Sequence, residues 1–145
     1  MSPKENKMRA RRLYEGVFSQ HDLRVLDQLV GDDFVDHDAP PGVPQGPDGL
    51  KQSAQLYLAA FPDLRFTIED QLAEGDRVAT RFMAHGTHQG LFFGIPPTGK
   101  PVEVGGIAID RFAAGKLVES WLVYDRLGLL QQLGAVPAGA PVPPA

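Results

Sequence analysis

The 145-residue chain contains no cysteine. Disulfides, thiolate metal ligands and a cysteine nucleophile are therefore excluded. It also lacks any apolar run approaching the roughly 20 residues that a membrane-spanning helix needs. Positive charge is not in excess, because 14 Lys and Arg stand against 18 Asp and Glu, for a formal net charge of −4. Since domains that bind nucleic acid are usually basic, we expect neither a nucleic-acid nor a membrane partner.

Several chemical motifs are missing as well. No glycine-rich loop leads from a strand into a helix, as nucleotide-binding folds require, and no serine lies in a nucleophile-elbow context. The spacing of the four histidines matches no standard metal-ligand set, so we expect no metal and no cofactor. No signal-peptide-like apolar segment follows the N-terminus, which favours a soluble, cytoplasmic protein.

The first half of the sequence has helical periodicity. Apolar residues at positions 10, 13, 14, 17 and 18 form one face of a helix. A second short helix is expected near 22–30. A third is expected to begin with Asp48 as its N-cap and to end before Pro62, after a proline-rich loop over 39–47.

The second half has the alternation of β-strands. Phe66 and Ile68 alternate with polar residues, and further strands are expected over 78–88, 102–112 and 117–124. Asp125 then caps a closing helix that ends at Gly134. We therefore predict a single α+β domain over 1–134, with helices on one face of a curved antiparallel sheet, and a loose Pro/Ala-rich tail over 135–145.

Three sequence segments carry a family resemblance. They are Phe34 with Asp36-His37, the run Gly86-Thr87-His88-Gln89-Gly90 with Pro96-Pro97-Thr98-Gly99, and Glu119-Ser120-Trp121 continuing through Asp125 to Gly134. Together they resemble the SnoaL-like polyketide cyclase family. The resemblance implies the NTF2-like cone, in which a curved antiparallel sheet and three to four helices enclose a cavity. We expect the 39–47 and 89–100 loops to roof it.

The sequence departs from the resemblance where the chemistry is expected. In the aldol-type cyclases of the family, an aspartate general acid/base follows the position of Trp121, and a cavity histidine lies on the preceding strand. These positions hold Leu122 and Ala108. Neither side chain can transfer a proton, so the acid/base mechanism of the family does not transfer by position.

Strand alternation indicates other candidate groups. If Ala108 faces the cavity, Asp110 does too, and a carboxylate on an apolar face would have a raised pKa and could act as an acid or base. The alternative is an aspartate wetted by solvent or paired with Arg111 or Arg126. By the same alternation, Ser120 and Tyr124 share a face with Leu122 and offer hydroxyl donors.

Three other candidates each have two interpretations. His37 is either a proton shuttle at the cavity or a loop residue bonded to a neighbouring aspartate. Asp125 is a cavity acid or, as we favour, a helix N-cap. His88 holds the Pro-Pro loop or contacts substrate. The catalytic candidates are thus Asp110, His37, Tyr124 and Asp125, and the substrate-binding candidates are Tyr14, Phe34, Tyr57, His88, Ala108, Ser120, Trp121 and Leu122.

The resemblance implies a cofactor-independent cyclase of bacterial polyketide-type secondary metabolism, such as antibiotic biosynthesis. The expected reaction is shape-driven, pericyclic ring closure of a large apolar substrate, of the Diels–Alder type. One alternative is an acid/base-assisted cyclase or epoxide-opening enzyme that uses Asp110 and His37. Another is a non-catalytic small-molecule binding protein. Because both strand faces carry apolar residues, we expect a homodimer formed through the outer face of the sheet.

Overall fold

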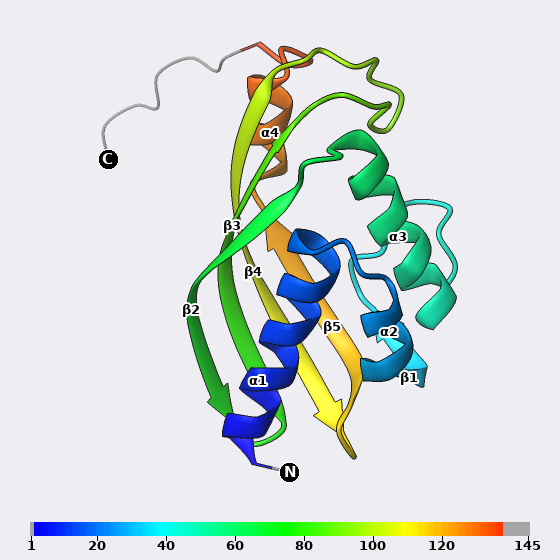
Figure 1. Cartoon of the computed structure of the whole chain (residues 1–145), viewed down its shortest axis with the longest axis vertical. Helices are drawn as coiled ribbons and strands as arrows, with labels where there is room; N and C mark the ends of the chain where they lie inside the picture. Colours follow the sequence, from blue (N-terminus) through cyan, green and yellow to red (C-terminus); the bar gives the residue numbers. More distant parts are fainter. Residues whose placement is uncertain (1, 138–145) are drawn as a thin grey trace.

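The computed structural model describes residues 2–137, which form four α-helices and one five-stranded sheet (Figure 1). In chain order, the elements are α1 (Pro3–Tyr14), a π-helical turn (Glu15–Ser19), α2 (Arg24–Leu29), β1 (Val30–Asp36), α3 (Pro47–Ala60), β2 (Arg65–Glu74), β3 (Arg77–Thr87), β4 (Pro101–Ala113), β5 (Lys116–Tyr124) and α4 (Arg126–Gln132). The predicted α+β architecture is confirmed.

The sheet has the strand order β1-β5-β4-β3-β2 and is curved and open. Helices α1, α2 and α3 lie on its concave face, and α4 lies at one end (Figure 1). The three pairs among β2 to β5 are antiparallel, as expected. The prediction of a purely antiparallel sheet is wrong, because strand β1 was not predicted and it pairs parallel with β5. The sheet is therefore mixed, and the expected helix near 22–30 ends at Leu29.

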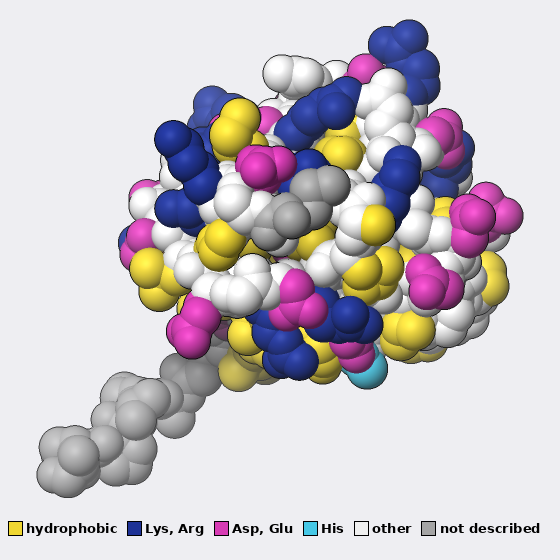
Figure 2. All heavy atoms as spheres, turned by 90° about the horizontal axis from the view of Figure 1, so that it is seen from below, with side chains coloured by type: hydrophobic (Ala, Val, Ile, Leu, Met, Phe, Trp, Pro, Cys, Tyr) yellow, Lys and Arg dark blue, Asp and Glu magenta, His cyan; other side chains and the backbone are white. Residues whose placement is uncertain are grey.

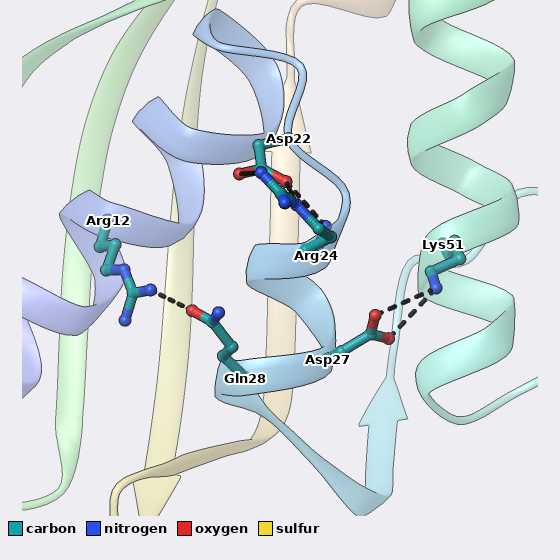
Figure 3. A network of polar contacts seen from close by, with 6 residues as sticks. All are labelled: Arg12, Asp22, Arg24, Asp27, Gln28 and Lys51. Atoms are coloured by element: carbon teal, nitrogen blue, oxygen red, sulfur yellow. Dashed lines mark hydrogen bonds and ion pairs between the residues drawn. The ribbon is translucent and has the colours of Figure 1, made fainter.

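The apolar stripe of the first helix packs into the main core. Ala10, Leu13, Tyr14 and Val17 are buried, as the periodicity predicts. Polar contacts join the three helices to one another above the sheet (Figure 3). The Arg12 side chain of α1 donates to Gln28 of α2, and the Lys51 ammonium of α3 lies 3.1 Å from the Asp27 carboxylate of α2. These exposed contacts link α1 and α3 to α2, which lies between them.

The Gly-Thr-His-Gln-Gly run fastens β3 to the end of α3. The backbone N–H groups of Gln89 and Gly90 both donate to the Ala60 carbonyl, which would otherwise lack a partner at the helix terminus. A Cβ on Gly90 would lie 2.0 Å from the Ala59 carbonyl oxygen, so only glycine fits this approach. The motif that is most distinctive in the sequence thus fixes the position of α3.

Of the two predicted helix N-caps, one is wrong and the other is confirmed. Asp48 is not the N-cap of α3, because Gly46 holds that position and Pro47 begins the helix, where its missing N–H costs nothing. Asp125 caps α4 as predicted, and its carboxylate accepts a hydrogen bond of 2.9 Å from the Gly128 N–H. Of the expected tail, residues 138–145 lie outside the described residues.

The outer surface is mixed in charge. On the face seen in Figure 2, Lys and Arg side chains are interspersed with Asp and Glu, with no extended area of one sign. No helix in residues 2–137 has the length and apolar character to span a bilayer.

Candidate active-site cavity

A cavity lies between the concave face of the sheet and the helices. Its empty space, including the opening to solvent, is about 1030 Å³. The lining consists of Leu13, Tyr14, Phe18, Leu26, Phe34, Asp36, Leu50, Tyr57, Phe61, Leu64, Phe66, Phe82, Ala84, His85, Val102, Val104, Asp110, Leu117, Ser120, Leu122, Tyr124 and Leu129. Most of these side chains are aliphatic or aromatic, as in a site for a large apolar ligand.

Four stacked aromatic rings form one wall. Phe66 stacks on Phe18 at 4.8 Å and on Phe82 at 4.5 Å between ring centroids, and Tyr14 stacks at slightly longer distances. Gly106 makes this possible, since a Cβ there would lie 2.5 Å from the Phe82 ring. Stacked rings held by two helices and two strands give the cavity a rigid shape.

One polar group in the cavity is the carboxyl of Asp110. Asp110 has no exposed surface, and its two oxygens accept hydrogen bonds from the Tyr14 hydroxyl at 2.6 Å and the Ser120 hydroxyl at 2.8 Å. Burial raises the pKa of Asp110 to about 6, although these two hydrogen bonds act in the opposite direction. The same burial, together with the nearby carboxylate, raises the pKa of Tyr14, so its phenol stays protonated.

A second polar group is formed by two tyrosines. The hydroxyl oxygens of Tyr57 on α3 and Tyr124 on β5 are 3.1 Å apart. The Arg126 guanidinium lies over the Tyr124 ring at 5.0 Å, and its Nε–H donates to the Tyr124 oxygen at 3.4 Å. Ser120 and Tyr124 share one face of β5 and are four residues apart, so the two polar groups are separated by about 13 Å along the strand.

Two further polar residues line the cavity but were missed from the sequence. Asp36 carried a usable signal, because it lies two residues after Phe34 and a strand would place both on one face. Partial burial raises the pKa of its carboxyl. His85 gave no such signal, since alternation from Phe82 and Ala84 predicts the opposite face.

His37 and Trp121 lie away from the cavity. The two rings stack at 4.7 Å between centroids, and the His37 Nε2 lies 2.7 Å from a Glu119 carboxylate oxygen. Trp121 also lies under the Arg77 guanidinium at 5.1 Å. Glu119 and Trp121 alternate with the cavity-facing Ser120 and Leu122, so this cluster is on the outer face of β5. The geometry therefore favours the interpretation of His37 as a loop residue, paired with Glu119 rather than with an adjacent aspartate.

Three other candidates also lie outside the lining. Ala108 is buried in the main core beneath α1, so it supports the wall without facing ligand. His88 is fully buried, and its Nδ1 accepts hydrogen bonds from the Thr98 backbone N–H and hydroxyl, which holds the Pro-Pro loop. Asp125 is the α4 cap already described. The remaining candidates, Asp110, Tyr124, Tyr14, Phe34, Tyr57, Ser120 and Leu122, all line the cavity.

The loops that were predicted to cover the cavity, 39–47 and 89–100, do not line it. Helix α3 covers the cavity through Leu50 and Tyr57, together with Phe61 just after the helix end. The 89–100 loop instead packs Phe92 and Phe93 against Tyr57 from outside. Within residues 2–137, no group of three or more His, Asp or Glu side chains is arranged to hold a metal ion.

Comparisons with known proteins agree with this architecture. IdmH, a proposed polyketide cyclase of Streptomyces antibioticus, is 39% identical, with a TM-score of 0.77 over 89% of this chain and 98% of its own. AclR, a proposed hydroxylase of Streptomyces galilaeus, is 32% identical, with a TM-score of 0.84 over 96% and 87%. TsrD of Streptomyces laurentii is 26% identical, with a TM-score of 0.85 over 94% and 99%.

Among curated proteins, none matches the chain in sequence. The family model for SnoaL-like polyketide cyclases, however, matches residues 8–133, which include every strand and helix that builds the cavity except the first residues of α1. The chain therefore belongs to the SnoaL-like polyketide cyclase family.

Proposed function

We infer that the protein is a cofactor-independent cyclase that closes a ring within a large, mostly apolar polyketide-type substrate. The observation that carries this inference is the cavity itself, which is lined by stacked aromatic rings and by aliphatic side chains, with few polar groups. Binding that holds the two reacting ends of a flexible chain together can remove several kcal/mol from the barrier to ring closure.

A shape-driven, pericyclic closure of the Diels–Alder type suits this cavity best. In such a closure the three π bonds of a diene and a dienophile become two carbon–carbon σ bonds and one new π bond, and no proton or electron leaves the substrate. Leu122 lines the cavity and Ala108 lies behind it, so neither family position supplies a proton. Both oxygens of Asp110 are already engaged by Tyr14 and Ser120, which suits a role in shaping the wall.

One observation favours a second mechanism, in which Asp110 assists the closure as an acid. Its pKa near 6 keeps an appreciable protonated fraction around neutrality, and it adjoins the cavity. A protonated carboxyl could donate to a carbonyl or epoxide oxygen. This mechanism predicts a rate that falls as pH rises through 6, whereas shape-driven closure predicts a rate independent of Asp110 ionisation.

Deleting the gene in its host tests the proposed function. The mutant should accumulate an uncyclised compound with the same mass as the missing product. Purified protein added to the mutant extract should convert one isomer into the other, followed by liquid chromatography and mass spectrometry. If the protein binds the accumulated compound but returns it unchanged, it is a non-catalytic binding protein and the proposal is wrong.

A further inference from the structure

Two of the three cavity tyrosines, Tyr57 and Tyr124, hydrogen-bond to each other, and together they have one hydroxyl hydrogen that this bond does not use. Tyr57 and Tyr124 carry two O–H groups, and the 3.1 Å contact between their oxygens uses one of them, whichever tyrosine donates. Within residues 2–137, no acceptor is placed to receive the other. Because a half-buried phenol in an apolar cavity retains a strong tendency to donate, this hydrogen is available to an acceptor atom on a ligand.

The surroundings of the pair strengthen this donor. Arg126 donates through its Nε–H to the Tyr124 oxygen, and its guanidinium lies over the same ring. Donors that point at the Tyr124 oxygen withdraw electron density and make the remaining O–H a better donor. Burial raises the pKa of Tyr57, so its hydroxyl stays protonated at neutral pH and remains a hydrogen-bond donor.

The same surroundings disfavour an anionic ligand. The carboxylate of Asp36 lies near Tyr57 and that of Asp38 lies near Arg126, close enough to affect the ionisation of both. These two carboxylates offset the positive charge of Arg126, so the site has no excess positive charge that would attract an anion. The acceptor that fits is therefore a neutral oxygen, and a carbonyl is the commonest one in a polyketide-type chain.

We propose that Tyr57, Tyr124 and Arg126 form a carbonyl-binding site, so that the substrate carries a neutral carbonyl group held about 13 Å along β5 from Ser120. This inference rests on the proposed function and names the chemical feature by which the substrate is oriented. In a Diels–Alder closure, a hydrogen bond to a carbonyl conjugated with the reacting double bond draws electron density from that bond. The site then positions the chain and also activates the double bond.

Equilibrium binding of a matched pair of probes tests the site. The ketone 2-acetylnaphthalene and the hydrocarbon 2-isopropenylnaphthalene have nearly the same shape, but only the ketone accepts a hydrogen bond. The ratio of their dissociation constants, measured by fluorescence titration, isolates that bond. Removing both hydroxyls with Tyr57→Phe/Tyr124→Phe should weaken ketone binding relative to the hydrocarbon about fivefold, because a neutral hydrogen bond contributes about 1 kcal/mol.

The single variants should show smaller changes, since each leaves one phenol that can turn to the ligand. Thr87→Val is the control, because it removes a hydroxyl that bonds Asp63 outside the cavity lining and should leave the ratio unchanged. The infrared carbonyl stretch of the bound ketone should also lie lower in the wild type than in the double variant.

Four results would overturn the carbonyl site. The first two are an unchanged ratio in the double variant and loss of the ketone preference in Thr87→Val. The others are tighter binding of the anion 2-naphthoate than of the ketone, and failure of the ketone to bind the wild-type protein. Because these measurements do not involve turnover, a protein that shows the predicted preference but converts no substrate would keep this site and lose the proposed cyclase function.

Discussion

At the scale of single residues, Asp110 has an unusual environment for a carboxyl group. It is fully buried, and only hydroxyl groups, rather than cations, hydrogen-bond to its carboxyl. Strand alternation from the sequence predicted that Asp110 would face the cavity if Ala108 did. Asp110 lines the cavity, whereas Ala108, on the same face of β4, lies behind its wall. The partnership with Tyr14, which lies 96 positions away in the chain, depends on how α1 crosses the sheet and had no sequence signal.

The pKa of Asp110 predicts how stability depends on pH. Its folded-state pKa of about 6 exceeds its ordinary value of 3.8, so the folded protein binds more protons than the unfolded chain between these values. Stability should therefore fall as pH rises from about 4 to 6, by up to about 3 kcal/mol for a shift of this size, and then level off.

The variant Asp110→Asn should lack this component. Chemical denaturation between pH 4 and 7 gives the free energy of unfolding of the wild type and of the variant. As pH rises, the wild type should lose stability relative to the variant. Parallel pH profiles for the two proteins would mean that Asp110 ionises normally.

At the scale of elements, long periodic segments could be predicted and short irregular ones could not. The strands β2 to β5 and the helices α1 and α3 follow their apolar periods closely. Strand β1 was not predicted because its two buried residues, Val30 and Phe34, are four positions apart, with a register irregularity between them. The polar residues between them show no alternation of apolar and polar positions. The parallel pairing with β5 could not be predicted either, because no local sequence pattern indicates it. Of the cavity residues on β1, Phe34 was predicted, whereas Asp36 was missed because the strand that puts it on the same face as Phe34 was not recognised.

The contact between residues 86–90 and the end of α3 should contribute to stability. Gly90→Ala would drive a Cβ into the Ala59 carbonyl and separate the run from the helix end, which should cost about 2 kcal/mol of stability. Gly105→Ala is the matched control, because its nearest neighbour would be 3.7 Å away and a strand tolerates alanine. Thermal unfolding of the two variants measures the difference. Equal stability would show that the close approach to α3 is not maintained in solution.

At the scale of the whole molecule, the helices cover only the concave face of the sheet. On the other face Ile107 is 50% exposed and Val123 is 73% exposed, and these residues are partners in adjacent strands. Leu72 and Ile109 extend the same apolar surface across the sheet. Exposed apolar surfaces of this kind are typical of protein–protein interfaces.

We expect a homodimer in which this outer face is the interface. Light scattering at micromolar concentration should give twice the chain mass of 15.7 kDa. Ile107→Glu should shift the protein to monomer, because it places a charge at the centre of the face, whereas Leu56→Glu on the exposed side of α3 should leave the dimer intact. A wild-type monomer, or a dimer that Ile107→Glu does not affect, would contradict this arrangement.

The central claim is that the shape of the cavity, rather than proton transfer, drives ring closure, and the rates of two variants test it most directly. Asp110→Asn removes the buried acid and should slow product formation tenfold or less, since acid–base catalysis contributes about 10²–10⁴-fold where it operates. Leu122→Trp fills the cavity and should slow it far more, whereas Leu56→Trp on the exposed side of α3 should have little effect. A loss of about a thousandfold in Asp110→Asn with ligand affinity and fold intact, beside a near-normal rate in Leu122→Trp, would contradict the account and make Asp110 the general acid.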